Sequence, residues 1–128
     1  MIIYGKRKKT ILIVEDEPTV RRALSDKFGR EGFTFLEAPD GEAGLALALK
    51  EHPDVILLDI IMPRMDGITM LKHLRNDAWG KDAHVIILTN LSDATKVSQA
   101  AERGVYDFLV KSDWKLADVV RKVKKHLG

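Results

Sequence analysis

The sequence predicts an α/β fold in which five parallel strands form one doubly wound sheet with helices on both faces. Two observations support this prediction. Short apolar runs alternate along the chain with segments of helical spacing, and three of these runs are continuous in Val, Ile and Leu. Continuous runs are typical of strands that are buried on both faces of a parallel sheet. Strand–helix alternation requires crossover connections, and crossovers join parallel strands.

The apolar runs that we predict as strands lie at residues 11–14, 33–38, 55–58, 85–88 and 108–110. Five strands of this length fit the flavodoxin-like strand order 2-1-3-4-5. In sheets of this kind, ligands bind beyond the carboxyl ends of the strands. Functional residues are therefore expected directly after each run.

Helix start and stop residues occur between the runs. Pro18 suits the first turn of the first helix, and Gly32 suits its end. Asp40 is the expected N-cap of the second helix, which ends before Pro53. Residues 76–83 are expected to form a loop. The other helices are predicted over residues 68–75, from a cap at Ser92 or Asp93 to Gly104, and along the apolar stripe Leu116, Val119, Val120, Val123 and Leu127.

Length and composition restrict the class of protein. The chain has 128 residues, which is the size of one compact domain, and its 45% hydrophobic content excludes a disordered chain. No cysteine is present, which excludes disulfides and thiolate metal sites and suits a reducing compartment. The apolar runs are shorter than the roughly 20 residues of a membrane span, and the N-terminus lacks the features of a signal peptide. We therefore expect a soluble cytoplasmic protein.

The basic residues are unevenly distributed. The net charge is only +2, so we expect no direct nucleic-acid binding. Basic residues nevertheless gather at 6–9 and at 121–126. Such runs are either solvated ends of the chain or contacts for an acidic partner. Residues 1–9 are expected to be a basic extension, and residues 10–128 the folded domain.

Polar residues close four of the predicted strands. They are Glu15 and Asp16 after the first strand, Asp59 after the third, Thr89 after the fourth and Lys111 after the fifth. Each has a structural alternative: the first two could cap a helix, Asp59 could be a turn residue, Thr89 is common in strands, and a lysine is usually solvated. Their joint occurrence at one edge of the sheet favours a functional site.

The residue types in this set suit phosphoryl transfer. Three carboxylates repel one another unless a cation lies among them, and oxygen ligands with some water suit Mg²⁺. Asp59 is then either a metal ligand alone or also a nucleophile that forms an acyl phosphate. Lys111 can neutralise phosphoryl oxygens, and Thr89 can donate a hydrogen bond to one of them.

Four motifs in this order resemble the receiver domain of two-component response regulators, over residues 10–127. They are 12-LIVEDEP-18, 56-ILLDIIMPRMDG-67, 86-IILTNLSD-93 and 107-DFLVKS-112. The resemblance implies that Asp59 is the phosphoacceptor and that a histidine kinase or phosphotransfer protein is the donor. It also implies a regulatory domain that catalyses only its own phosphotransfer and autodephosphorylation.

The resemblance assigns further roles. It implies Mg²⁺, with Mn²⁺ as an alternative, bound by Asp16, Asp59 and the backbone carbonyl of Ile61, with Glu15 acting through water. Lys111 would contact the phosphoryl group. Thr89 and Phe108 would form the switch that shifts the face built from the fourth helix, fifth strand and fifth helix. A downstream protein target or an output domain outside this chain would read that face, and the domain would be a monomer or a phosphorylation-dependent dimer.

The sequence also departs from the family pattern. Ser112 follows Lys111 where the family usually has proline, and Asn90 follows Thr89 where it usually has a small residue. Ile61 and Leu91 are apolar, and we hypothesise that they hinder an attacking water and prolong the life of the acyl phosphate. Two other functions remain open: a binding module that does not use phosphate, and a metal-dependent phosphatase. The phosphatase usually needs a second aspartate at the position of Ile61.

Overall fold

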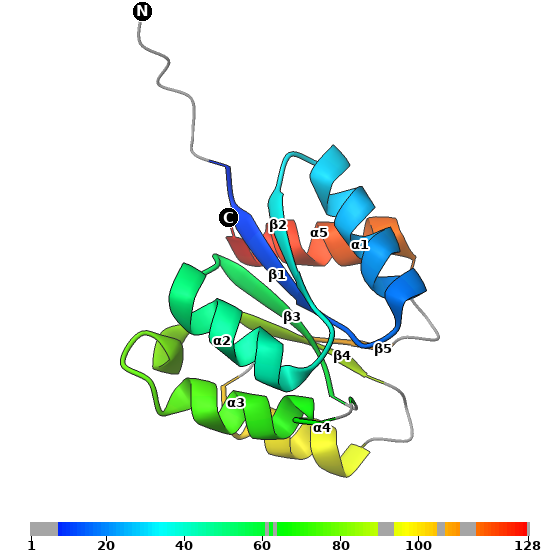
Figure 1. The fold of residues 1–128 in the computed structure, drawn as a ribbon. Helices are drawn as coiled ribbons and strands as arrows, with labels where there is room; N and C mark the ends of the chain where they lie inside the picture. Colours follow the sequence, from blue (N-terminus) through cyan, green and yellow to red (C-terminus); the bar gives the residue numbers. More distant parts are fainter. Residues whose placement is uncertain are drawn as a thin grey trace, which may run out of the picture.

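The computed structural model describes residues 8–60, 62, 64–89, 94–104, 107–110 and 115–127. Within these residues the chain forms a five-stranded parallel sheet in the order β2-β1-β3-β4-β5 (Figure 1). The strands are β1 (Thr10–Val14), β2 (Thr34–Ala38), β3 (Val55–Asp59), β4 (Val85–Thr89) and β5 (Asp107–Val110). The predicted fold class and strand order are therefore confirmed.

The helices cover both faces of the sheet (Figure 1). They are α1 (Pro18–Arg30), α2 (Gly41–Glu51), α3 (Gly67–Arg75), α4 (Ala94–Ala101) and α5 (Leu116–Leu127). α1 and α5 lie on one face, and α2, α3 and α4 lie on the other. No helix in the described part of the chain is long and apolar enough to cross a membrane.

Two separate apolar cores follow from the alternation of side chains along each strand. Ile11 and Ile13 of β1 pack towards α1 and α5, whereas Leu12 and Val14 pack towards α2 and α3. β3, in the middle of the sheet, is buried along its entire length. Continuous apolar runs in β1, β3 and β4 are needed because both faces of these strands are covered.

Several helix boundaries agree with the predicted signals. Pro18 is the first residue of α1. The Asp40 side chain caps α2 by accepting a hydrogen bond of 2.8 Å from the backbone N–H of Ala43. Gly32 and Gly104 follow helix ends with φ values of 91° and 70°, the left-handed region that favours glycine. The predicted cap at Ser92 or Asp93 lies outside the described residues.

Strand boundaries differ from the prediction by one residue: β1 and β5 begin one residue earlier, β3 and β4 end one residue later, and β2 begins one residue later. β2 begins at Thr34, and Phe33 instead packs edge-on against Phe28, with 5.1 Å between ring centroids. Residues 76–83 are not only a loop, because Gly80–Asp82 form a short 3₁₀ helix, η1. Trp79, beside it, stacks on His52 at 4.3 Å and packs against the core below α2 and α3.

Candidate functional site

Asp59 is the last residue of β3, the central strand of the sheet. Its Cα is paired with that of Leu88 on β4, and the residue is 5% exposed. The buried strand is paired with β1 up to Leu58 and with β4 as far as Asp59 itself. The carboxylate is therefore held at a rigid edge of the sheet.

Glu15 and Asp16 lie in the turn between β1 and α1. The backbone N–H of Glu15 donates to the carbonyl oxygen of Ala38 at 3.1 Å, so the turn is anchored to the end of β2. Glu15 is fully buried and Asp16 is half-buried. Neither residue caps α1: Glu17 is at the N-cap position and makes no side-chain capping bond. The acidic pair therefore precedes the N-cap position, although the Glu15 carboxylate accepts a hydrogen bond from the backbone N–H of the N-cap residue Glu17.

The tertiary structure brings these three acidic residues together. Carboxylate oxygens of Glu15, Asp16 and Asp59 all lie within 4.8 Å of one another, the one such group of potential metal ligands in the described residues. Oxygens that share one Mg²⁺ ion lie about 2.1 Å from the metal and therefore about 3–4 Å from each other. The three residues thus fit a small, hard divalent cation, which would also relieve their mutual repulsion.

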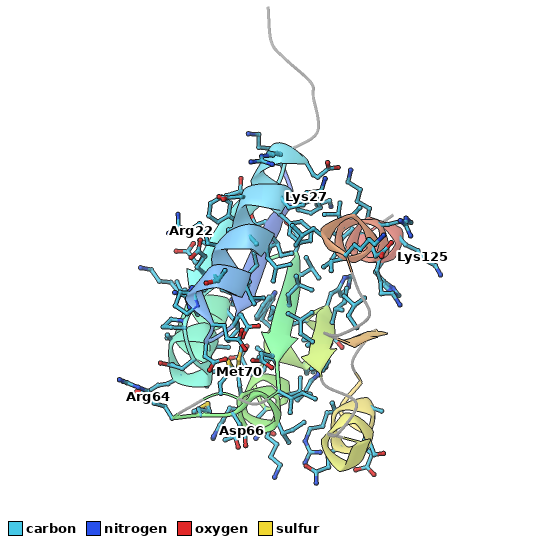
Figure 2. All side chains as sticks on the ribbon, turned by 90° about the vertical axis from the view of Figure 1, so that its right-hand side faces the viewer. Arg22, Lys27, Arg64, Asp66, Met70 and Lys125 are labelled. Carbon is cyan, nitrogen blue, oxygen red and sulfur yellow. The ribbon has the colours of Figure 1, made fainter. Side chains whose placement is uncertain are left out.

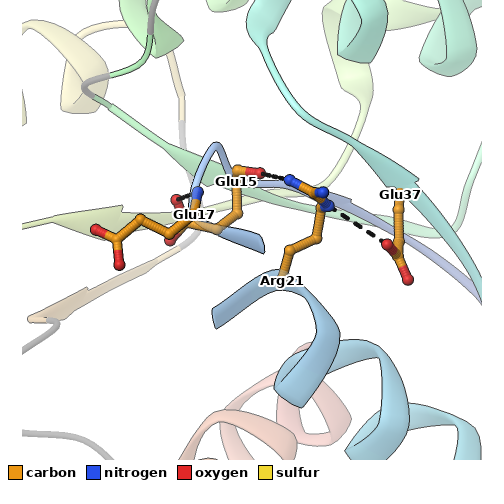
Figure 3. A network of polar contacts seen from close by, with 4 residues as sticks. All are labelled: Glu15, Glu17, Arg21 and Glu37. Carbon is orange, nitrogen blue, oxygen red and sulfur yellow. Dashed lines mark hydrogen bonds and ion pairs between the residues drawn. The ribbon is translucent and has the colours of Figure 1, made fainter. Parts of the chain in front are cut away.

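A network around Arg21 supports the acidic turn (Figure 3). Nη1 of Arg21 donates to the backbone carbonyl oxygen of Glu15 at 2.8 Å, and its Nε donates to the carboxylate of Glu37 at 3.3 Å. The backbone N–H of Glu17 donates to the Glu15 carboxylate at 3.4 Å. Arg21 was not among the predicted site residues. Its only signal in the sequence is a basic residue five positions after Asp16, in the first turn of the predicted helix.

The loop after Asp59 turns back sharply onto the end of β3. The backbone N–H of Gly67, at the start of α3, donates to the carbonyl oxygen of Ile60 at 2.7 Å. A Cβ at position 67 would lie 2.4 Å from the carbonyl oxygen of Asp59, so only glycine fits this approach. Asp66 caps α3 by accepting a hydrogen bond from the backbone N–H of Thr69 at 2.8 Å.

The other predicted residues are located only in part. Thr89 ends β4, and its Cα is paired with that of Val110, which ends β5. Phe108 lies on β5 opposite Ile87. The structure describes the backbone but not the side chains of Thr89 and Phe108. The remaining residues of the prediction, which are Ile61, Asn90, Leu91, Lys111 and Ser112, lie outside the described residues.

Comparison with protein families places this arrangement among known proteins. Residues 11–124 match the family model of the response regulator receiver domain. The probable transcriptional regulator ycf27 of Galdieria sulphuraria is 39% identical over 106 residues, which cover 83% of this chain and 40% of that protein. The regulatory protein AtoC of Escherichia coli is 41% identical over 101 residues, 79% of this chain and 22% of that protein. The chain thus spans about half or less of the length of these curated relatives.

Solved structures show the same fold. A putative response regulator from Chloroflexus aurantiacus superposes with a TM-score of 0.86 at 30% identity, covering 94% of this chain and 98% of that one. The signal receiver domain of a signal transduction histidine kinase from Syntrophus aciditrophicus gives a TM-score of 0.83 at 32% identity, covering 93% and 89% of the two chains.

Proposed function

Because this chain belongs to the response regulator receiver domains, the signalling domains of two-component systems, we propose that Asp59 is its phosphoacceptor. The observation that carries the proposal is the group of three carboxylates at the carboxyl ends of β1 and β3. Asp59 is the one member of the group that ends the central strand, where its position is most tightly fixed.

The proposed reaction transfers one phosphoryl group. A carboxylate oxygen of Asp59 forms the new O–P bond, and the bond from phosphorus to the donor breaks. When the donor is a phosphohistidine of a kinase or phosphotransfer protein, the electron pair of the P–N bond returns to the imidazole nitrogen. The protein contributes mainly position and charge, because phosphoryl transfer needs little covalent assistance.

Asp16 and Asp59 would hold Mg²⁺, or Mn²⁺, directly, together with the backbone carbonyl of Ile61. Glu15, which is fully buried, would act through water. The metal would supply positive charge to the phosphoryl oxygens. Lys111 would contact the same oxygens, and the Thr89 hydroxyl would donate a hydrogen bond to one of them.

The signalling step would be a shift between two conformations. The Thr89 hydrogen bond would exist only in the phosphorylated form, so phosphorylation would favour one arrangement of Thr89 and Phe108. The face built from α4, β5 and α5 would report it. On that face, a hollow of about 240 Å³ is lined by Leu109, Asp118, Arg121, Lys122 and Lys125 (Figure 2 labels Lys125). Its basic rim would steer an acidic target.

In this proposal, the signal is passed to a partner that binds the α4-β5-α5 face. The curated relatives named above are regulators longer than this chain. The partner that binds the α4-β5-α5 face would therefore be either an attached output domain or a separate protein. The domain would act in the cytoplasm, as a monomer or a phosphorylation-dependent dimer.

Ile61 and Leu91 would slow hydrolysis of the acyl phosphate by hindering water. Faster loss of the phosphoryl group in Ile61→Asn is the expected result, and an unchanged fast rate in both proteins contradicts this part.

The decisive experiment is phosphorylation by a small donor. The protein is incubated with Mg²⁺ and acetyl phosphate, and its intact mass is measured beside Asp59→Asn. One phosphoryl adduct in the wild type and none in the variant is the expected result. Absence of an adduct in a protein that binds Mg²⁺ would contradict phosphotransfer and favour a phosphate-independent binding module. Steady turnover of a phosphomonoester would instead indicate a phosphatase.

A further inference from the structure

The N-terminus of α2 rests on the loop that follows Asp59. Gly41, the first residue of α2, donates its backbone N–H to the carbonyl oxygen of Met65 at 3.0 Å. Met65 belongs to the connection between β3 and α3. Two segments that are distant in the sequence are therefore joined through their backbones, beside the acidic group.

The contact leaves no space for a side chain. A Cβ at position 41 would lie 2.2 Å from the carbonyl oxygen of Met65 and 2.9 Å from its carbonyl carbon. Both neighbours are backbone atoms, so neither can rotate away as the end of a flexible side chain would. Gly41 is not among the described residues with positive φ. Glycine is required here by the closeness of the two backbones and not by an unusual conformation.

A second contact joins the same two segments. Asp40 is 8% exposed and caps α2 through one carboxylate oxygen. Its other oxygen lies 3.7 Å from Nε of Arg64, the residue before Met65. Arg64 itself has a φ of 69°, which is uncommon for a residue with a side chain. Figure 2 shows Arg64 at the outer end of this loop, beside α2.

The start of α3, two residues after Met65, is in equally close contact with the end of β3. Gly67 approaches the backbone of Asp59 and Ile60, as described above. Residues 64–67 thus contact the start of α2 through Met65 and the end of β3 through Gly67. Met65 is only two residues before Gly67, so a displacement of Met65 acts through Asp66 and Gly67 on the backbone next to Asp59.

We propose that Gly41 is a positioning residue for phosphotransfer: its backbone sets the position of Met65 and, through Gly67, the position of the backbone at Asp59. This inference rests on the proposed phosphoacceptor role of Asp59. It extends the functional unit to α2, which contributes no side chain to the acidic group. A side chain at position 41 pushes the loop away from α2 and misplaces the site.

The experiment compares two substitutions in the first turns of α2. Gly41→Ala presses on the Met65 backbone. Gly44→Ala is the matched control, because its Cβ would meet only side-chain atoms of the core, at 2.9 Å from Val14 and 3.2 Å from Met70. Both substitutions crowd their surroundings, but only the first acts on the loop. Phosphorylation rate from acetyl phosphate, the Mg²⁺ concentration for half-maximal rate and the free energy of unfolding are measured for each.

The expected result is a separation of rate from stability. Gly41→Ala lowers the phosphorylation rate per folded molecule by roughly tenfold or more, since misplacing reacting groups by about 1 Å can cost about a hundredfold. It also raises the Mg²⁺ requirement. Gly44→Ala keeps the rate per folded molecule within about twofold. Equal rates per folded molecule in the two variants would overturn the inference, provided that the wild type is phosphorylated.

A measurement on the wild type covers the case in which Gly41→Ala does not fold. The amide resonance of Gly41 is followed by NMR during a Mg²⁺ titration, with the amide of Gly44 as reference. Gly41 donates to the loop, whereas Gly44 donates to Asp40 within the start of α2. A Gly41 shift at the midpoint of Mg²⁺ binding supports the inference, and a Gly41 amide that does not respond to saturating Mg²⁺ overturns it. Failure of wild-type phosphorylation with a normal Gly41 response would count against the proposed function alone.

Discussion

The guanidinium group of Arg75, at the end of α3, donates from Nε to the backbone carbonyl oxygen of Arg103 at 2.7 Å. The same group donates to the carbonyl oxygens of Gly104 at 3.0 Å, Gly80 at 2.7 Å and Ala83 at 2.9 Å. One planar side chain with five N–H donors thus satisfies carbonyl groups after α4 and around η1. It fixes α4 to α3 at the edge opposite the acidic group.

Arg75→Lys should destabilise the protein by roughly 2 kcal/mol or more, because an ammonium group cannot reach four separated carbonyl oxygens. The net loss of even one hydrogen bond to a charged group costs about 1.5–3 kcal/mol. Urea unfolding measures the change. Lys72→Ala, one turn earlier on the exposed side of α3, is the control and should stay within about 0.5 kcal/mol of the wild type. A fully stable Arg75→Lys would show that these bonds contribute nothing net.

Mg²⁺ should raise the thermal unfolding midpoint, because under the proposed function it would bind only the folded protein, in which Glu15, Asp16 and Asp59 are assembled. Without divalent cations, Asp16→Asn should be more stable than the wild type by about 1 kcal/mol, since it removes one of three neighbouring negative charges. With saturating Mg²⁺ the order should reverse. Thermal unfolding with chelator and with Mg²⁺ tests both statements, and equal Mg²⁺ responses in the two proteins would exclude Asp16 as a ligand.

Gly67→Ala should lower both stability and phosphorylation, because its Cβ would lie 2.4 Å from the carbonyl oxygen of Asp59. Crowding of this kind costs typically about 1–3 kcal/mol. Gly29→Ala is the contrasting substitution: its Cβ would meet the Phe35 ring at an acceptable 3.4 Å, within α1. Alanine in a helix is about 0.5–1 kcal/mol better than glycine, so this variant should be as stable as the wild type or more so. Denaturant unfolding compares the two.

Stability should fall as the pH drops below the ordinary histidine pKa of 6.5, partly because of His84. Burial lowers the pKa of His84 below its ordinary value, and the charge of Arg75 lowers it further. The unfolded chain therefore binds a proton at a higher pH than the folded protein does. The contribution of neutral His84 is complete above the ordinary pKa and is lost as the pH falls through the lowered one. His84→Gln should show a smaller loss than the wild type over this range; parallel pH profiles would contradict the assignment.

Local patterns determine much of the fold. Continuous apolar runs mark β1, β3 and β4 because both faces of each are covered, and Pro18, Asp40, Gly32 and Gly104 mark helix boundaries through fixed backbone requirements. β2 has a weaker pattern because it is an edge strand, where Phe35 is exposed and burial is incomplete. The sequence places Phe33 in this strand because an apolar residue there can be either the first residue of the strand or a core residue that precedes the strand. The structure shows the second.

The acidic residues of the site were found in the sequence because each directly follows a predicted strand. Parallel strands place their carboxyl ends at one edge, so the topology implied that Glu15, Asp16 and Asp59 would meet. Arg21 and Gly41 were not found, because their importance depends on which backbone they approach across the fold and not on their neighbours in the chain.

The sequence by itself therefore determined the elements, their order and the acidic residues at the strand ends, because these depend on periodicity and on residue chemistry within a few positions. Only the tertiary structure decided that Gly41 lies against Met65 and that Arg75 reaches the carbonyl groups after α4. Such contacts arise where segments far apart in the chain pack side by side. Their geometry is set by the packing of helices on the twisted sheet, which no local pattern specifies.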